Sequence, residues 1–340
     1  MGLFSSRDPL QIIVFQTYGS NTHLYVKGRA LEDENIDLTK KNFIHLLINS
    51  WKRFETDVIG NCTLEIKLPN GALNEFETDK EGYFLLALDK TDLQSMCNKE
   101  GWLAFEVSYA DRSLKRNIQL ENRFPGEMLI PSKDADFGVI SDIDDTILQT
   151  GMVSLLKWRV LYNTFLKTPE RRIPLAGAPE FYHLLHRGDS GDKANPIFYV
   201  SNSPWNLYLY LEFFLKNNNF PKGPILLRSL SSFFKRKKLK GPDDRPHKIN
   251  EILNILKTYP RLSFVLIGDG GEKDADIYLE IAQRFPNRIK AIYLRSVKHK
   301  KKMLRVVGLF QDNKAIPVLL VEDSDQAIKH AKEQGLIIKK

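Results

Sequence analysis

The stretch FGVISDIDDTILQTG, residues 137 to 151, joins a short apolar run to three closely spaced carboxylates. The run that ends at Ile140 has the composition of a buried strand in a parallel sheet. Active sites of parallel sheets gather where such strands give way to loops. Carboxylates crowded there repel one another unless a cation neutralises them, and oxygen ligands of this kind suit magnesium. The stretch therefore predicts a magnesium site that contains Asp142, Asp144 and Asp145. It also predicts that the substrate is a phosphate ester.

Two other interpretations of this stretch need testing against the sequence. A calcium-binding EF-hand loop that started at Asp142 would need Gly at its sixth position and Glu at its twelfth, where this chain has Ile147 and Val153. An acidic turn that caps a following helix is the second alternative, and a lone DxDxT pattern favours it about as much as catalysis. The rest of the chain has to decide between them.

Two further segments carry groups that suit phosphate binding. IFYVSNSPW, residues 197 to 205, is a second apolar run that ends in a hydroxyl residue, Ser201, and Pro204 then allows a helix to begin. A hydroxyl and free backbone amides at that point suit a phosphate. Lys248 precedes a helical pattern that starts at Ile249, so its ammonium is expected near a helix start.

The third segment is LSFVLIGDGGEKDADIYLEIAQRF, residues 262 to 285, in which a buried strand ends at Asp269 and Asp274 follows before a helix. Each segment alone has an ordinary explanation. Ser201 is more often a cap or turn residue, Lys248 a surface charge, and the loop after Asp269 a plain strand-to-helix connection. Their ordered combination with the first stretch favours a catalytic site.

Taken together, DxDxT, a strand-terminal Ser, a Lys before a helix and GDxxxxD resemble the four motifs of the haloacid dehalogenase superfamily, over roughly residues 135 to 325. SDIDDTILQTG, FYVSNSPWNLY, the His-Lys pair, and LIGDGGEKDADIY followed by RFPNRIKAIYLR are similar to the actin-patch-type phosphatidate phosphatases and their bacterial relatives. One departure is Gly270, where the family pattern leads us to expect serine, and it changes the contacts available to that loop.

The resemblance implies a role for each residue of the motifs. Asp142 would attack phosphorus and form an aspartyl-phosphate, while Asp144 would protonate the leaving oxygen and later deprotonate water. Magnesium would be held by Asp142, Asp269 and the main-chain carbonyl of Asp144. The remaining positions would bind phosphate (Ser201, Asn202, Lys248) or support the site (Asp145, Thr146, Asp274).

Composition predicts a soluble, two-domain protein: 340 residues are long for one core, and 42% hydrophobic with 27% charged residues is ordinary for globular chains. No apolar run has the length of a membrane span, and MGLFSSRDPL lacks the apolar region of a signal peptide, so we expect a cytoplasmic protein. Cys62 and Cys97 cannot form a disulfide framework, which fits a reducing compartment. MGLFSS also matches the loose myristoylation pattern at Gly2, for which a chance match is the simpler explanation.

Residues 10 to about 130 differ from the rest, because their apolar residues alternate as in half-buried strands. KNFIHLLINSWKRF, residues 41 to 54, interrupts this pattern with helical spacing. FETDKEGYF, residues 76 to 84, is similar to a turn of transthyretin-like and carboxypeptidase-regulatory-like β-sandwiches. We therefore predict a β-sandwich-like domain with one inserted helix over residues 1–132, with strands that include 24–27, 62–68, 83–88 and 102–109.

From Asp136 onward, buried runs alternate with helical patterns, as in a parallel sheet with right-handed crossovers. The predicted fold class is α/β, with a Rossmann-like haloacid dehalogenase domain over residues 133–340. LLKWRVLYNTFLK, residues 155 to 167, is expected to form a small cap, a membrane-facing helix or a core crossover helix. The expected strands are 137–141, 197–201, 225–228, 263–268, 289–294 and 317–321.

The net charge of +8 is concentrated in two runs, FFKRKKLK at 233 to 240 and KHKKK at 298 to 302. At about 1 kcal/mol per basic residue, such runs can hold a protein peripherally on an anionic membrane, although a solvated loop is an equal alternative. No nucleic-acid-binding motif accompanies them, so no nucleic acid partner is expected. The membrane-contact candidates are Phe233, Phe234, Lys235, Arg236, Lys237 and Lys238.

These observations predict a magnesium-dependent phosphatase that converts phosphatidate to diacylglycerol and phosphate, with the lipid identity implied by the resemblance alone. A phosphatase for soluble sugar or nucleotide phosphates is a second possibility. A membrane-binding adaptor with an idle catalytic fold is a third, and the complete set of carboxylates argues against it.

Overall fold

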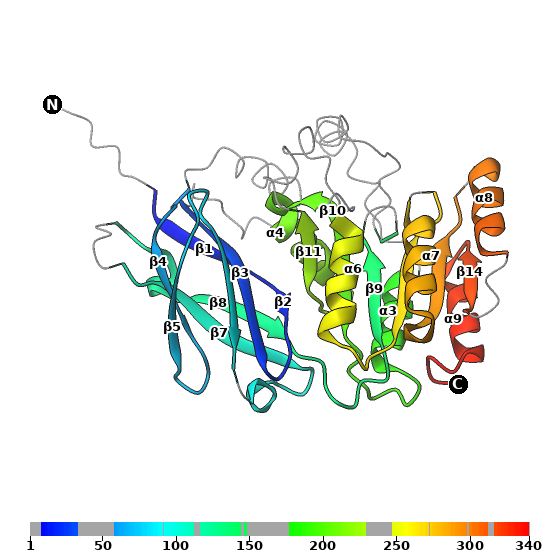
Figure 1. The fold of residues 1–340 in the computed structure, drawn as a ribbon, viewed down its shortest axis with the longest axis horizontal. Helices are drawn as coiled ribbons and strands as arrows, with labels where there is room; N and C mark the ends of the chain where they lie inside the picture. The colour runs from blue at the N-terminus through cyan, green and yellow to red at the C-terminus, as the bar shows by residue number, and fades with distance from the viewer. Residues whose placement is uncertain are drawn as a thin grey trace. The chain divides into compact units, whose positions relative to one another are not determined.

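The computed structural model describes residues 8–32, 58–90, 92–111, 116–143, 146–147, 177–228, 247–271, 273–297, 299–311 and 316–339. The chain divides into two compact units, Met1–Ile130 and Pro131–Lys340 (Figure 1). The division falls two residues before the predicted boundary at 132/133. In the part of the chain that the structure describes, no helix is both long enough and apolar enough to cross a membrane.

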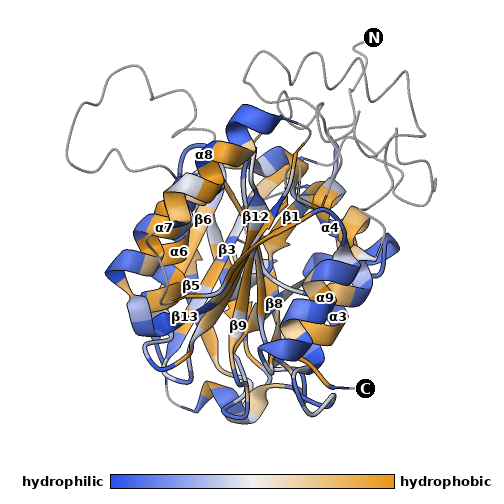
Figure 2. Ribbon diagram, turned by 90° about the vertical axis from the view of Figure 1, so that its right-hand side faces the viewer, coloured by the Kyte–Doolittle hydropathy of each residue, from blue (hydrophilic) through white to orange (hydrophobic). Residues whose placement is uncertain are grey.

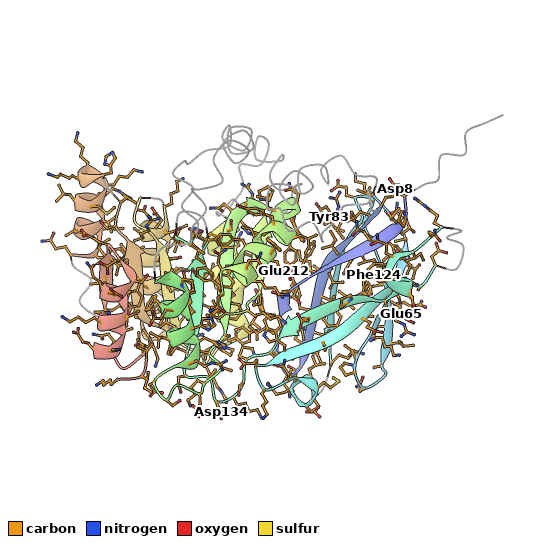
Figure 3. The ribbon with its side chains drawn as sticks, turned by 180° about the vertical axis from the view of Figure 1, so that it is seen from behind. Asp8, Glu65, Tyr83, Phe124, Asp134 and Glu212 are labelled. Carbon is orange, nitrogen blue, oxygen red and sulfur yellow. The ribbon has the colours of Figure 1, made fainter. Side chains whose placement is uncertain are left out.

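The first unit contains two β-sheets that share one hydrophobic core. The smaller sheet has the order β1-β3-β6 and the larger one the order β2-β8-β7-β4-β5. Leu24 and Val26 of the smaller sheet and Leu64 and Ile66 of the larger one belong to the same buried cluster, as does Phe124, which Figure 3 labels. The strands are β1 (Leu10–Phe15), β2 (Thr17–Tyr18), β3 (His23–Glu32), β4 (Thr63–Lys67), β5 (Leu73–Glu77), β6 (Tyr83–Asp89), β7 (Trp102–Tyr109) and β8 (Phe124–Leu129), with 3-10 turns η1 (Leu93–Met96) and η2 (Gln119–Asn122).

The four strands predicted for this unit fall on β3, β4, β6 and β7. The helix predicted over residues 41 to 54 lies outside the described residues, and the transthyretin-like assignment stays a prediction. Within the described residues, the two sheets and their alternating burial agree with the expected all-β character of the unit.

The second unit is built around six parallel strands in the order β11-β10-β9-β12-β13-β14. β9 and β12 are buried along their whole length, because helices cover both faces of the sheet. Figure 2 shows α6 and α7 on one face and α3 and α9 on the other. The strands are β9 (Gly138–Asp142), β10 (Ile197–Pro204), β11 (Ile225–Arg228), β12 (Phe264–Asp269), β13 (Ile289–Arg295) and β14 (Val318–Val321).

The helices of this unit follow the strands in turn, as the alternating pattern predicts. α3 begins after a glycine and carries Pro at its start, and Gly188 ends it. The helices are α3 (Ala178–Arg187), α4 (Tyr208–Asn217), α6 (His247–Thr258), α7 (Asp274–Arg284), α8 (Lys300–Phe310) and α9 (Ser324–Glu333), with 3-10 turns η4 (Trp205–Leu207) and η6 (Pro286–Arg288).

Five of the six strands predicted for this unit match to within one residue at either end, but the predicted end of β10 is wrong. We expected the strand to stop at Ser201, and it continues to Pro204. Its register with β11 shifts between Val200 and Pro204, so an irregular stretch of strand replaces the expected loop. Such a bulge depends on the pairing partner and leaves no local signal in the sequence.

Candidate active site

The candidate site lies at the carboxyl ends of the three central strands of the second unit. β9 ends at Asp142, and its neighbours are β10 on one side and β12 on the other. From β9 the chain continues through β10 to β11 on one side of the sheet, and then through β12 and β13 to β14 on the other side. The ends of β9 and β12 therefore form the switch point where ligands bind in such sheets. Val200 of β10 is the register partner of Asp142, and Ile267 of β12 is the partner of Ser141. Residues that follow these partners therefore come together at one edge.

A buried ammonium group joins two of the predicted aspartates. The Lys248 Nζ donates to Asp142 Oδ1 at 2.7 Å and to Asp274 Oδ1 at 2.5 Å, and all three side chains are at most 1% exposed. Burial, the largest influence, would lower the pKa of Lys248, but the charges of Asp142 and Asp274 and the hydrogen bonds to them raise it above its ordinary value. The lysine therefore remains charged, although it lies in the protein interior.

The loop after β12 holds Asp269 and Asp274 in fixed positions. Asp269 is buried at the end of the strand, and its Oδ1 accepts a hydrogen bond from the Gly271 N–H at 2.5 Å. The Asp269 N–H in turn donates to Asp274 Oδ2 at 3.1 Å. A Cβ at Gly268 would lie 2.6 Å from that same oxygen, so only glycine lets Asp274 approach the strand this closely. Asp274 thus ties β12 to Lys248 with its two oxygens.

Gly270, the departure from the family pattern, lies where two backbones meet. Its N–H donates to the Arg295 carbonyl of β13 at 2.9 Å, and a Cβ at this position would lie 2.8 Å from the same carbonyl oxygen. A serine would therefore force the loop or β13 to shift. In this chain the backbone N–H of Gly270 connects the loop to β13, and no side-chain hydroxyl is present at this position.

Tyr278 lies against the end of β12, close to the end of β9. It lies one helical turn after Asp274 on α7, is 1% exposed, and its hydroxyl donates to the Ile267 carbonyl at 2.8 Å. Ile267 is the register partner of Ser141, the residue before Asp142, so this bond fixes β12 beside the predicted nucleophile. Burial, together with the nearby Asp274 and Asp142, raises the pKa of Tyr278 well above its ordinary value, so the hydroxyl stays neutral.

The main-chain carbonyl of Asp142 is held by two hydroxyl groups. Ser141 Oγ donates to the Asp142 carbonyl at 2.7 Å and lies 2.5 Å from the Tyr182 hydroxyl of α3. Since the serine hydrogen points to the carbonyl, Tyr182 is the donor to Ser141. Burial raises the pKa of Tyr182, which keeps this donor protonated. The main-chain carbonyl of Asp142 is thus fixed by a chain of two buried hydroxyls.

The remaining predicted residues lie in different environments. Thr146 Oγ1 donates to Asp142 Oδ2 at 3.2 Å, so it contacts the predicted nucleophile itself as well as bracing the loop. Ser201 is fully buried one residue beyond Val200, and its Oγ accepts a hydrogen bond from the Ser203 N–H at 2.9 Å. Asn202, predicted to bind phosphate, is exposed.

Several predicted residues lie outside the described part of the chain. These are Asp144 and Asp145, the segment 155 to 167, the basic run 233 to 240, and Gly2. Among the residues that are described, no group of three or more His, Cys, Asp or Glu side chains is placed to hold a metal ion. The predicted set of metal ligands includes the carbonyl of Asp144, so this set stays a prediction.

Sequence reasoning missed Ser141, Tyr182 and Tyr278. A signal existed for Tyr278, because it follows Asp274 by one helical turn and so shares a face of α7 with it. Ser141 is a polar residue inside an otherwise apolar run, so its buried hydroxyl is expected to have a hydrogen-bond partner. Nothing in the sequence indicates Tyr182, since only the packing of α3 brings it to the strand.

A parallel α/β sheet with buried aspartates and a lysine at its carboxyl edge has the organisation of a catalytic domain. The family model described as the phosphatidate phosphatase APP1 catalytic domain matches residues 137–296, from the start of β9 to just beyond β13. This part of the chain is therefore similar to that family. The assignment to the haloacid dehalogenase superfamily stays a prediction.

Two curated relatives each match about half of the chain. The chain is 38% identical over 176 residues to phosphatidate phosphatase APP1 of Saccharomyces cerevisiae, which covers 52% of this chain and 28% of that protein. It is 31% identical over 160 residues to an uncharacterized protein of Schizosaccharomyces pombe, covering 47% of this chain and 25% of that one. The chain thus spans little more than a quarter of the length of the relatives it matches.

Among solved structures, a carbohydrate esterase matches with a TM-score of 0.23 and 10% identity, over 91% of this chain and 99% of that chain. A similarity this low carries no argument about fold or function.

Proposed function

We propose that this protein is a magnesium-dependent phosphatase that hydrolyses phosphatidate to diacylglycerol and phosphate. The observation that carries the proposal is the Lys248 ammonium, buried between Asp142 and Asp274 at the carboxyl edge of the sheet. It lies in the part of the chain that matches the family model of the phosphatidate phosphatase APP1 catalytic domain. The activity in the name of the yeast relative is that of the longer protein, and we extend it to this chain as a proposal.

Asp142 is the proposed nucleophile. Lys248 binds one carboxylate oxygen and Thr146 the other, while Ser141 holds the main-chain carbonyl. A carboxylate fixed at so many points loses little orientational freedom on reaction, which favours in-line attack. Attack forms a bond between an Asp142 oxygen and phosphorus as the bond to the lipid oxygen breaks, which gives an aspartyl-phosphate and diacylglycerol.

Asp144 is the proposed acid and base. Protonated Asp144 gives its proton to the departing lipid oxygen and then, as a carboxylate, takes a proton from water. The resulting hydroxide attacks phosphorus, breaks the Asp142–phosphate bond and releases inorganic phosphate, which restores both residues to their starting states. Lys248 stabilises negative charge on the phosphoryl oxygens throughout.

The charges of the described residues fit a divalent cation. Three buried carboxylates, Asp142, Asp269 and Asp274, lie at the carboxyl edge of the sheet, and the Lys248 ammonium pairs with two of them. Neighbouring carboxylates repel one another, so a cation near them would stabilise the site. Asp142, Asp269 and the Asp144 carbonyl would hold magnesium, which prefers such oxygen ligands. Bound there, magnesium would weaken the repulsion between carboxylate and phosphate.

The test is hydrolysis by the purified protein of phosphatidate in vesicles, with magnesium and with chelator. The panel should also contain a sugar phosphate, a nucleoside monophosphate and p-nitrophenyl phosphate. We expect magnesium-dependent release of phosphate from phosphatidate at a higher kcat/KM than from the soluble esters. A preference for a soluble ester would favour a small-molecule phosphatase, and no turnover of any ester would favour a non-catalytic adaptor.

Asp142→Asn is the inactive control, and Asp134→Asn is its matched partner. Asp134 is exposed and precedes β9, at the opposite edge of the sheet from the site (Figure 3). We expect Asp134→Asn to retain full activity. Equal activity of both variants would contradict the role proposed for Asp142.

A further inference from the structure

One exposed helix face combines aliphatic and basic side chains. On α8, Val306 and Phe310 pack inward, whereas Leu304 is 72% exposed and Val307, one turn further along, is 56% exposed. Among the large hydrophobic residues exposed in the described part of the chain, these two form the only pair on a single element. Figure 2 shows hydrophilic and hydrophobic stretches together on this helix. We define the α8 face as Lys300, Lys301, Leu304, Arg305 and Val307, all of them exposed.

Lys300 and Lys301 of the α8 face lie at the amino end of the helix, where positive charge is unfavourable. α8 begins with three lysines and has no acidic residue in its first turn, although the amino end of a helix repels positive charge. Lys302 has a structural partner, because its Nζ donates to the Gly271 carbonyl at 2.7 Å. Lys300 and Lys301 make no hydrogen bond or ion pair with any described residue. A local arrangement that opposes stability without compensation is typical of a functional surface.

The α8 face lies beside the candidate active site. The bond from Lys302 to Gly271 attaches the start of α8 to the loop that follows Asp269. A Cβ at Gly270 would lie 3.1 Å from Met303 Cε, so the helix packs directly on this loop. Arg305 also pairs with Asp276 of α7, and the two helices lie next to each other in Figure 1. A surface bound to α8 would therefore stand close to the edge of the sheet where the phosphate ester is proposed to react.

We infer that the α8 face docks on an anionic lipid surface and brings the site to its membrane-borne substrate. The inference rests on the proposed function in that it assumes a lipid substrate. Leu304 and Val307 are long enough to enter the boundary between headgroups and acyl chains, and lysines around them keep their ammonium groups among the headgroups. The hot spots of protein–protein interfaces are enriched in Trp and Tyr, and the α8 face has neither residue. The combination fits an acidic bilayer better than a protein partner.

The test is sedimentation of the full chain with phosphatidylcholine vesicles that contain or lack phosphatidylserine, in the presence of chelator. Phosphatidylserine is not a phosphate monoester and chelator stops turnover, so binding is measured independently of hydrolysis. Lys300→Ser/Lys301→Ser should weaken binding to anionic vesicles about 25-fold, since each basic residue contributes a factor of about five. Leu304→Ser/Val307→Ser should weaken it roughly tenfold or more.

Two matched double variants separate the α8 face from general changes in charge or surface hydrophobicity. Lys329→Ser/Lys339→Ser removes the same charge from other exposed positions, and Leu73→Ser/Leu85→Ser removes leucines that are 55% and 58% exposed in the other unit. Both should bind as the wild type does. Because all eight positions are on the surface, no variant should have a lower melting temperature than the wild type.

Wild-type vesicle binding by both α8 variants would overturn the inference. So would equal binding of the wild type to neutral and anionic vesicles, or loss of RNA binding in the α8 variants while vesicle binding is unchanged. The proposed function can fail separately: a protein that binds anionic vesicles through α8 but hydrolyses no phosphatidate would reject the activity and leave the lipid-binding surface in place.

Discussion

Replacing Tyr278 with phenylalanine removes a single hydroxyl from the end of β12. That hydroxyl donates to the Ile267 carbonyl at 2.8 Å, so its loss removes a hydrogen bond from a buried backbone carbonyl. A buried donor or acceptor that loses its partner costs about 1 to 3 kcal/mol. We therefore expect the free energy of unfolding of Tyr278→Phe to fall by about 1 to 3 kcal/mol.

Tyr199→Phe is the matched control. Tyr199 is also fully buried in the second unit, and its hydroxyl donates to the Pro221 carbonyl at 2.7 Å. The loss of this one bond should cost about 1 to 2 kcal/mol and should leave turnover unchanged. The comparison separates the general cost of removing a buried hydroxyl from the specific effect on Asp142.

The effect on catalysis follows from the position of Asp142 at the end of β9. Without the hydroxyl, the Ile267 carbonyl of β12 is held less firmly beside the end of β9, and the Asp142 carboxylate is held less precisely between Lys248 and Thr146. A displacement of this kind lowers kcat by roughly 10- to 100-fold, whereas KM changes little. The assay combines denaturant unfolding with steady-state hydrolysis of phosphatidate. If Tyr278→Phe kept the kcat of Tyr199→Phe, Tyr278 would have no part in positioning the nucleophile.

Three further outcomes can be checked in the same protein. Asp269→Ala should lower magnesium affinity and kcat together, since a hard cation loses one of few carboxylate ligands, and unchanged affinity by calorimetry would exclude Asp269 as a ligand. Gly270→Ser should lower the free energy of unfolding by about 1 to 3 kcal/mol because its Cβ would lie 2.8 Å from the Arg295 carbonyl, and a variant as stable as wild type would contradict this. Burial, the largest influence, lowers the pKa of His330 below its ordinary value of 6.5, so the unfolded chain takes up the proton first and stability is lost as the pH falls from that value toward the folded pKa. His330→Gln should show a smaller loss of melting temperature between neutral and mildly acidic pH, and an equal loss would exclude His330 as its source.

The parallel strands of the second unit could be predicted from sequence because each is a short, continuous apolar run bounded by polar residues. β12, for example, is buried at every position. Two strands of the first unit that were not predicted, β5 and β8, lack this signal. In β5, LNEFE, no side chain is fully buried, and β8 contains Pro125 and Gly126, which disfavour a strand. Tertiary pairing with β4 and β7 determines these two strands.

The aspartates and the lysine of the candidate site could also be named from sequence, because each follows or precedes a recognisable element. Their contacts could not. The bond between Lys248 and Asp274 depends on how α6 and α7 pack on one face of the sheet, and the Tyr182–Ser141 bond depends on α3 from the other face. Such contacts arise from tertiary packing. The sequence indicates a contacting residue only where helical spacing relates it to a recognised motif, as it relates Tyr278 to Asp274.

The most direct test of the proposed mechanism is the mass of the protein quenched in acid during turnover of phosphatidate. Acid preserves an acyl-phosphate, and peptide mapping locates it. We predict one added phosphoryl group on the peptide that contains Asp142, absent without magnesium and absent in Asp142→Asn. Rapid turnover with no covalent phosphoryl group, or a phosphoryl group on another residue, would contradict Asp142 as the nucleophile.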